Sequence, residues 1–349
     1  MARRVLFVLR GKLGDTLILF MAVRRYVEQF AQDDVTLLMR KDYANLLAGE
    51  TGFRLVPFGS RLEMIARLGW LRVRRESFDV LAVLWGFGPP MRTISRLVAA
   101  RRRIYLDGRF ADLYPEWPRL PAEATLIDPA MRVIQCFEPR LEQPDRLHLA
   151  SLAALRVSGA EAIGVVPIAD ELRRNLDPPA LSALLAEVAA RHPGNPIRVF
   201  VNPANTGSRQ ILDATLPAGV EVRKFSNLVD LLQEYRTLAA WYGTDTGLYH
   251  LAAAMGIPAT VFFGPTQPWK IVMPGQPATT WVRMQVLGRT HCEEKSCTRP
   301  LCLHQAVASF GRAAPSSSLA DTPIACPLRA YPAQALAAIT LHENPRHQA

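Results

Sequence analysis

The 349-residue chain lacks the long apolar segments that mark membrane-spanning and secreted proteins. No window of 18 residues is both uncharged and apolar, so no transmembrane helix is expected. The basic start Met1-Ala2-Arg3-Arg4 is followed by the apolar run 5–9, which is too short for a secretory signal. These absences indicate a cytoplasmic protein.

Familiar nucleotide-binding and nucleic-acid-binding motifs are also missing. Residues 10–15 form a glycine-containing loop that is neither a GxGxxG fingerprint nor a P-loop. Lys12 precedes the second glycine, and no GK[ST] occurs. No helix-turn-helix, RRM or zinc-finger pattern is present, so we expect no nucleic-acid partner.

Cysteine is scarce, with five residues in the chain. Cys136 stands apart as an expected core residue, and the other four fall in a late cluster with two histidines. Their spacing is not the paired CxxC of a zinc site. Reduced thiols and a structural metal site both remain open, the candidate ligands being Cys292, Cys297, Cys302 and Cys326.

Strand and helix patterns alternate along the chain, first to about residue 106 and again from about residue 162. Short apolar runs such as 5–9 and 260–263 are typical of buried parallel strands. The length suffices for two domains. The sequence predicts two Rossmann-like α/β domains, over residues 1–155 and 156–330, and a C-terminal helix and tail over residues 331–349.

The most specific segment runs from Trp241 to Thr266 and predicts a strand, a polar turn, a helix and a second strand. The turn Thr244-Asp245-Thr246-Gly247 places hydroxyls, a carboxylate and backbone N–H groups at a helix start. Helix starts carry unpaired N–H donors and partial positive charge, so they bind phosphate groups. Ligands of parallel sheets bind beyond the carboxyl ends of the strands, where this turn falls.

An isolated Asp-Thr-Gly has simpler explanations. The commonest is an N-cap and turn without a binding role. Asp-Thr-Gly also occurs in aspartic proteases, where it lies on a hairpin loop and needs a second carboxylate in a matching half. No second Asp-Thr-Gly or Asp-Ser-Gly is present, and a helix follows Gly247, so we exclude a protease.

The 26-residue block as a whole resembles the donor-nucleotide signature of the family 9 glycosyltransferases, the heptosyltransferases of lipopolysaccharide assembly. That signature has an Asp-Thr-Gly, a histidine three residues later, an alanine-rich helix and a strand ending in Gly-Pro-Thr. The matching residues are Asp245, Thr246, Gly247, His250, Gly264, Pro265 and Thr266. The resemblance implies the GT-B type of α/β fold, with two Rossmann-like domains facing each other across a cleft.

The N-terminal loop supplies a second match. In heptosyltransferases this loop ends in Gly-Asp before an apolar helix, and its aspartate is the proposed general base. Gly14-Asp15 fits that pattern, which implies a catalytic role for Asp15. On local grounds alone, Asp15 is also explained as a helix N-cap. Lys12 would add positive charge near the donor phosphates.

A third element departs from the family pattern. After the first strand of the second domain, heptosyltransferases carry a lysine, thought to hold the donor pyrophosphate, and then an aromatic-Pro pair. Here Arg174 takes the place of the lysine, and Leu176-Asp177 the place of the pair. Arginine neutralises a pyrophosphate and adds a bidentate fork, but a solvated arginine at a helix start explains the residue equally well.

Positive charge dominates, with 41 Lys and Arg against 31 Asp and Glu and a net charge of +10. This balance implies an acidic partner. A solvated basic face and an anionic glycolipid at the inner membrane both fit the arginine-rich stretch 61–103, and in the resembling family the N-terminal domain binds the acceptor. Because a run of three arginines is almost never buried, the expected acceptor-binding residues are Arg72, Arg74, Arg75, Arg101, Arg102 and Arg103.

The resemblance implies an inverting, metal-independent glycosyltransferase that moves a heptose or similar sugar from an ADP-sugar to a lipopolysaccharide core or other lipid-linked acceptor. Asp15 would deprotonate the acceptor hydroxyl. The expected donor-binding residues are Lys12, Arg174, Thr244, Asp245, Thr246, Gly247, His250 and Phe225. No catalytic cofactor is expected. The expected location is cytoplasmic and peripheral to the inner membrane, with transient contact to its surface.

Two other functions remain open. A relative of this family that glycosylates autotransporter proteins uses a cysteine-bound iron, so the cysteine cluster favours a protein heptosyltransferase with a structural zinc or iron. A non-catalytic nucleotide-sugar-binding protein is the second alternative. The presence of both Asp15 and Asp245 argues against it.

Overall fold

The computed structural model describes residues 2–86, 90–120, 124–170, 174–176, 178–205, 208–212, 216–263, 268–273, 275–276, 279–286 and 306–310. The chain divides into two compact units. The first comprises Met1–Ala154 and Met273–Gly275, and the second begins at Leu155 and holds the rest of the chain. Each unit is a mostly parallel sheet with helices, so the predicted α/β fold class is confirmed.

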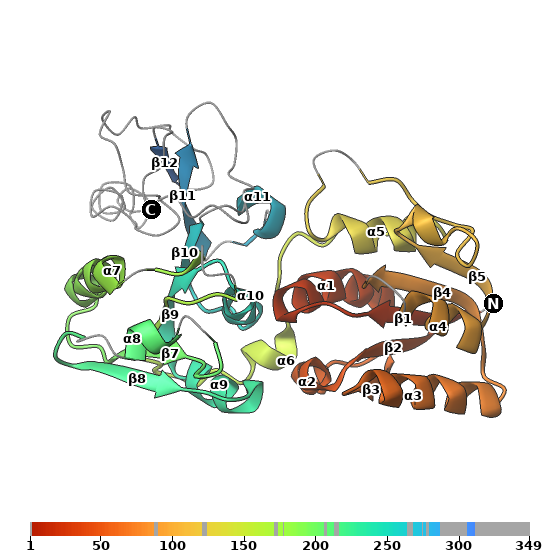
Figure 1. The fold of residues 1–349 in the computed structure, drawn as a ribbon, viewed down its shortest axis with the longest axis horizontal. Coiled ribbons are helices and arrows are strands. Elements are labelled where there is room, and N and C mark those ends of the chain that lie inside the picture. Colours follow the sequence, from red (N-terminus) through yellow and green to blue (C-terminus); the bar gives the residue numbers. More distant parts are fainter. Residues whose placement is uncertain are drawn as a thin grey trace. The chain divides into compact units, whose positions relative to one another are not determined.

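The sheet of the first unit has five parallel strands in the order β3-β2-β1-β4-β5 (Figure 1). Val5 to Leu9 of the central strand are all buried, as expected for an apolar strand that helices cover on both faces. The strands are β1 (Arg4–Leu9), β2 (Asp34–Arg40), β3 (Arg54–Phe58), β4 (Ser77–Trp85) and β5 (Ala99–Tyr105).

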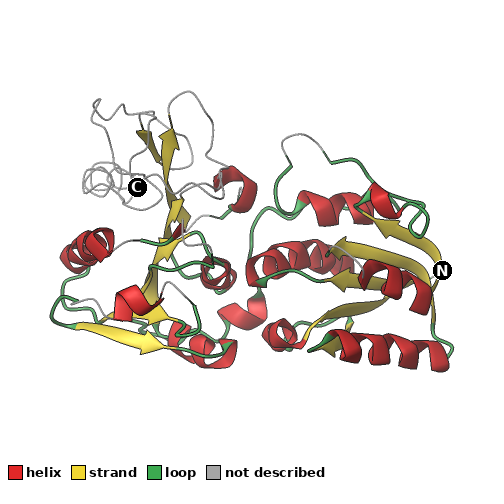
Figure 2. Cartoon of the chain, in the orientation of Figure 1, coloured by secondary structure: helices red, strands yellow, loops and turns green. Residues whose placement is uncertain are grey.

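Helices lie on both faces of this sheet (Figure 2). On one face α1 packs against α5, and on the other α3 packs against α4. The helices are α1 (Leu13–Gln29), α2 (Lys41–Ala44), α3 (Arg61–Val73), α4 (Pro90–Leu97), α5 (Asp128–Gln135) and α6 (Ala150–Ala153), with 3₁₀ turns at Asn45–Leu47 and Gly108–Phe110.

The sheet of the second unit has seven strands in the order β12-β11-β10-β9-β6-β7-β8, all parallel except β12 (Figure 1). Sequence analysis predicted β6 to β10 but not the last two strands. The strands are β6 (Ala162–Val166), β7 (Ile197–Val201), β8 (Val220–Lys224), β9 (Leu238–Thr244), β10 (Ala259–Phe263), β11 (Thr279–Val286) and β12 (Ala306–Phe310). The helices are α7 (Pro178–Arg191), α8 (Ser208–Leu212), α9 (Leu228–Tyr235), α10 (Gly247–Ala254) and α11 (Pro268–Ile271).

Each sheet has one point where the direction of winding reverses. In the first sheet this point lies between β1 and β4, and in the second between β6 and β9. Loops that leave neighbouring strands in opposite directions open a crevice at the carboxyl edge, where ligands of such sheets bind. The fold therefore directs attention to the segments that follow β1, β6 and β9.

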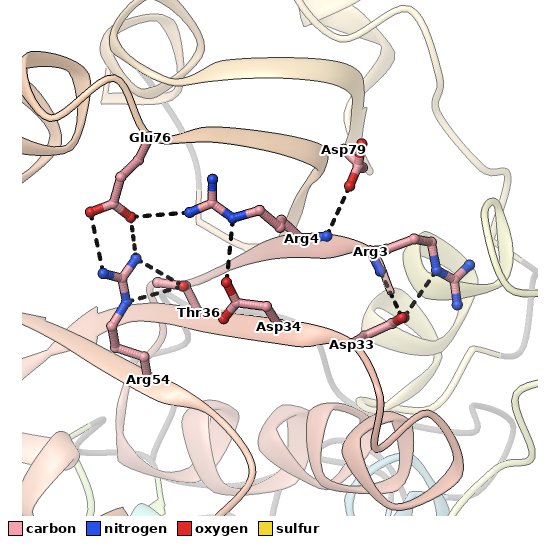
Figure 3. A network of polar contacts seen from close by, with 8 residues as sticks. All are labelled: Arg3, Arg4, Asp33, Asp34, Thr36, Arg54, Glu76 and Asp79. Carbon is pink, nitrogen blue, oxygen red and sulfur yellow. Dashed lines mark hydrogen bonds and ion pairs between the residues drawn. The ribbon is translucent and has the colours of Figure 1, made fainter. Parts of the chain in front are cut away.

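The opposite, amino-terminal edge of the first sheet is held together by ion pairs and hydrogen bonds (Figure 3). The backbone N–H of Arg4 donates to Asp79, and its guanidinium pairs with Asp34 and Glu76. Arg54 of β3 pairs with the same Glu76, which lowers the pKa of that carboxyl below its usual value. These contacts link the starts of four neighbouring strands.

Arg3 makes the most buried of these contacts. Its Nε lies 2.9 Å from the carboxylate of Asp33, whose side chain is fully buried, and its Nη2 lies 3.0 Å from Glu138 beyond α5. The hydroxyl of Tyr26 in α1 also donates to Asp33. Arg3 thus compensates the charge of a carboxylate that joins the start of β2 to α1, and it links this carboxylate to the segment after α5.

We predict that Arg3→Ala lowers the free energy of unfolding by about 3 kcal/mol, because it removes the arginine that pairs with the buried carboxylate of Asp33 and one of the two that pair with Glu138. Arg140→Ala is the matched control. Arg140 also pairs with Glu138, but its side chain is exposed, so the loss should stay under about 1 kcal/mol. Urea denaturation of the three proteins measures both values. Equal losses for the two variants would contradict the prediction.

Candidate active site

The turn after β9 forms the centre of the candidate site. β9 ends at Thr244, and Thr246 has the extended backbone of an N-cap, so α10 begins at Gly247. The backbone N–H of Asp245 donates to the carbonyl of Phe262 in β10, which fixes the turn against the sheet. The first N–H groups of a helix have no partners within it, and they point out of the carboxyl edge here.

Gly243 allows the ends of β9 and β6 to approach each other. A Cβ at this position would clash with the backbone carbonyl of Val166, which belongs to the neighbouring strand and cannot swing away. Only glycine fits without moving one strand. The absent side chain brings the segment after β6 beside the turn after β9.

Arg174 and Asp245 meet at this point. The Nη1 of Arg174 lies 3.1 Å from the Oδ2 of Asp245 and donates to its backbone carbonyl at 3.2 Å. The Asp245 side chain is almost fully buried, and Arg174 is mostly buried. Arg174 follows β6 in a segment held by two hydrogen bonds: the N–H of Leu176 donates to the carbonyl of Pro167, and the N–H of Ala169 donates to the Asn175 side chain. The structure therefore joins two of the predicted donor-binding residues in one ion pair.

His250 lies in the first half of α10 and is buried. Burial, and to a lesser extent the charge of Arg174, lowers the pKa of its imidazole to about 3. The ring is therefore neutral at physiological pH and cannot serve as a cation. Its Nδ1 has no hydrogen-bond partner within the described residues, and neither has the buried Oγ1 of Thr244. Buried polar atoms are mostly hydrogen-bonded in proteins, so these two atoms are candidates for contact with a ligand or a bound water.

Phe225 lies just beyond β8, at the same edge of the sheet. It is half-buried, and its backbone N–H donates to Val201 at 3.2 Å. All the predicted donor-binding residues except Lys12 thus lie at the carboxyl edge of the second sheet. Lys12 belongs to the first unit.

Lys12 and Asp15 lie at the corresponding edge of the first sheet, where β1 leads into α1. The helix begins at Leu13, three residues earlier than predicted, so Asp15 lies in its first turn. The backbone N–H of Lys12 donates to the Oδ2 of Asp15 at 3.2 Å. A Cβ on Gly11 would lie 2.6 Å from the Cβ of Asp15, so glycine is needed for this tight start. Asp15 therefore has a capping contact and is half-buried at the ligand-binding edge.

The six arginines expected to bind an acceptor lie elsewhere. Arg72, Arg74 and Arg75 lie at the end of α3, before β4 begins, and the other three lie in the middle of β5. Because the strands are parallel, the end of α3 belongs to the amino-terminal edge, opposite the loop that carries Asp15.

The three consecutive arginines of β5 do not form one surface. Side chains alternate between the two faces of a strand, so Arg102 points away from its neighbours. Arg102 pairs with Glu116 and donates to the carbonyl of Cys136 at 2.9 Å, whereas Arg101 is exposed. Arg101 is thus exposed and Arg102 is half-buried, and the acceptor-binding role of these arginines stays a prediction.

A basic cluster that sequence analysis missed lies at the ligand-binding edge instead. Arg10 follows β1, Arg40 ends β2 and Arg61 begins α3. Burial lowers the pKa of Arg10, and the nearby charges of Arg40 and Arg61 lower it further. Cations gathered at such an edge suit a phosphate or carboxylate group. The sequence could have indicated this cluster, because basic residues follow the ends of neighbouring predicted strands.

Several predicted features lie outside the described residues. They are Gly264, Pro265 and Thr266 of the signature, the cysteines Cys292, Cys297, Cys302 and Cys326, and residues 331–349. The part of the chain that the structure describes has no group of three or more His, Cys, Asp and Glu side chains that could hold a metal. No helix within the described ranges is long and apolar enough to cross a membrane.

Comparison with known proteins points to one family. Residues 223–302, which include the turn after β9 and its helix, match the model described as Glycosyltransferase family 9 (heptosyltransferase). No curated protein matches the chain.

Solved structures of similar fold carry the same description. Escherichia coli heptosyltransferase WaaC with ADP is 16% identical, with a TM-score of 0.65, covering 80% of this chain and 93% of that one. E. coli ADP-heptose lps heptosyltransferase II is 17% identical, with a TM-score of 0.61 and coverage of 85% and 95%. The dodecameric iron-containing heptosyltransferase TibC with ADP-D-beta-D-heptose is 14% identical, with a TM-score of 0.52 and coverage of 84% and 64%. These similarities confirm the GT-B type of fold.

We predict that His250 makes stability depend on pH. Its pKa is about 3 in the folded protein and near 6.5 when unfolded, so the unfolded state binds more protons between these values. Stability is therefore full above pH 6.5 and falls as the pH is lowered. Between pH 7.5 and 5 the wild type should lose about 2 kcal/mol more than His250→Gln. Chemical denaturation at both pH values measures this, and parallel losses would show that His250 is solvated.

Proposed function

We propose that this chain, a glycosyltransferase of the family 9 type, uses ADP-heptose as its donor. Its acceptor is the lipopolysaccharide core or a similar lipid-linked sugar. The observation that carries the proposal is the Arg174–Asp245 pair beside the start of α10. A guanidinium and the N–H groups of a helix start form a site for a pyrophosphate. Similar folds were solved with ADP and with ADP-D-beta-D-heptose.

The donor-binding residues have different roles in this proposal. Arg174, Thr246, Gly247 and the dipole of α10 stabilise the ADP that leaves, because negative charge develops on its phosphate in the transition state. Asp245 holds Arg174 in place. Thr244 and His250 offer their buried polar atoms to the donor or to a water that holds it. Phe225 contacts the nucleoside, and Lys12 adds positive charge.

Asp15 acts as the general base in this mechanism. Its carboxylate takes the proton of an acceptor hydroxyl, whose oxygen then attacks the anomeric carbon. The bond from that carbon to the phosphate oxygen breaks, and ADP leaves with the electron pair. Attack from the face opposite the leaving group inverts the configuration.

The acceptor belongs to the first domain in this proposal. Its anionic groups bind the cluster Arg10, Arg40 and Arg61, which lies at the edge that carries Asp15. The exposed arginines at the amino-terminal edge are too far along the strands for that contact. They face the anionic inner membrane, on which the protein acts as a peripheral enzyme.

A protein acceptor is the second candidate. The similarity of fold to TibC and the cluster of Cys292, Cys297, Cys302 and Cys326 favour it. In that case the cysteines would hold a structural zinc or iron. Assay of both acceptor classes with one ADP-sugar separates the two functions.

We predict that ADP and ADP-heptose raise the melting temperature, because they bind the folded state alone. The variant Arg174→Ala should lose most of this shift. Arg236→Ala is its control, since Arg236 is a half-buried arginine of the same unit whose side chain donates to the carbonyl of Leu155. Differential scanning fluorimetry with a panel of nucleotides measures the effect. Stabilisation by UDP or GDP with none by ADP would refute the donor assignment.

We predict that Asp15→Asn lowers turnover about 10²-fold or more, the scale for losing a general base, and leaves ADP affinity unchanged. Asparagine keeps an oxygen that can accept the N–H of Lys12, so the start of α1 is preserved. Asp15→Ala is the comparison, because it removes both the base and the cap. Turnover near wild type in the asparagine variant, with lower stability in the alanine variant, would show that Asp15 is only a cap.

We predict that transfer survives EDTA. Fixed positive groups neutralise the leaving pyrophosphate, and Asp245, which is already paired with Arg174, has threonines rather than a second carboxylate beside it. The measurement is transfer rate and circular dichroism with EDTA and after added Mg²⁺. Loss of activity that Mg²⁺ restores without any change in folding would contradict the prediction. Loss of activity together with unfolding would indicate a structural metal at the cysteine cluster.

A further inference from the structure

Helix α3 has a second apolar face, directed away from the core. Met64, Leu68 and Leu71 point into the unit and are buried. On the opposite side, Leu62, Trp70 and Val73 are 78%, 58% and 75% exposed, and Ala66 between them is exposed too. Their spacing of four, four and three residues is about one helical turn each, so they form one stripe. We call these four residues the α3 stripe.

Basic side chains border the α3 stripe on both sides. Arg67 and Arg74 lie along one side and Arg61 and Arg72 along the other, all of them exposed. The guanidinium of Arg74 lies 5.7 Å from the centre of the Trp70 ring. The one acidic residue of the helix, Glu63, accepts from the N–H of Gly59 at 2.7 Å and pairs with Arg67 at 3.5 Å. The surface around the stripe is therefore strongly positive.

We infer that the α3 stripe docks on an anionic phospholipid surface. Trp70 and its aliphatic neighbours enter the boundary between headgroups and acyl chains, and the arginines reach the phosphates beside them. Figure 1 shows α3 beside β3 at the margin of the first unit, so the helix can lie flat on a surface. A 13-residue helix is too short to span a bilayer but long enough for this contact.

Charge complementarity favours an anionic lipid surface over a second copy of the chain as the partner of the α3 stripe. A second copy of the chain would bring Arg61, Arg67 and Arg74 against the same residues of its partner, which costs energy. A bilayer that contains anionic lipid supplies opposite charge along the whole helix. The inference deepens the proposed function, since it rests on it for the presence of a membrane-borne acceptor. The apolar face and its charges stand on the structure alone.

The test is sedimentation of the purified full chain with phosphatidylglycerol–phosphatidylcholine vesicles and with pure phosphatidylcholine vesicles. The wild type should bind the anionic vesicles, and binding should weaken as salt is raised. Replacing Leu62, Trp70 and Val73 by serine should weaken binding about tenfold or more. The matched control replaces the exposed Leu120, Trp117 and Val229 by serine and should bind as wild type does.

Other occupants give different results. Failure of the wild type to bind anionic vesicles, or equal binding by the stripe variant, overturns the inference. A dimer that the stripe variant converts to a monomer, without vesicle binding, assigns the stripe to a second copy. An unchanged melting shift with ADP shows that the stripe variant is folded, and Arg67→Gln, which should also weaken binding to anionic vesicles, is a milder second variant. Vesicle binding without transfer from any ADP-sugar rejects the proposed function and leaves the docking surface intact.

Discussion

The ion pair of Arg174 and Asp245 is the interaction on which the candidate site of the second unit depends. Asp245 is almost fully buried, and a carboxylate cannot remain ionised there without a cation beside it. The same guanidinium adds to the effect of burial on His250 and keeps its imidazole neutral. A fixed pair of charges next to a neutral ring gives the turn one electrostatic state over the physiological pH range. The guanidinium of Arg174 is therefore already in place for donor phosphates and would not have to move before they bind.

Topology explains why this pair forms where it does. In both sheets the first strand of the unit lies beside the strand to which the chain returns, so β1 adjoins β4 and β6 adjoins β9. The loops after β6 and β9 diverge from a common point, and Arg174 and Asp245 come from those two loops. Asp15 occupies the equivalent place after β1. The residues of the proposed mechanism therefore share one structural rule, although they are far apart in the sequence.

The sequence predicted what depends on local pattern and missed what depends on tertiary geometry. Apolar runs located β1 and β10 almost to the residue, and the block from Trp241 lies within the residues that the family 9 glycosyltransferase model matches. The start of α1 was placed too late, because Lys12 is not a typical N-cap residue. The pleat of β5 places Arg102 on the opposite face from Arg101 and Arg103, which the run of three arginines did not indicate. Arg10, Arg40 and Arg61 meet only because β1, β2 and β3 are neighbours, and no periodicity links them. The role of Asp15 remains a prediction.

Gly243 has a consequence for how such a site can change during evolution. The separation between the ends of β6 and β9 is set by the close approach of Gly243 to the backbone carbonyl of Val166. Residues beyond the strand ends can therefore vary while the frame stays constant. At Gly243 every other residue would add an atom where the carbonyl of Val166 already lies. Positions around the strand ends therefore tolerate substitution, whereas position 243 does not, because a side chain there has no room.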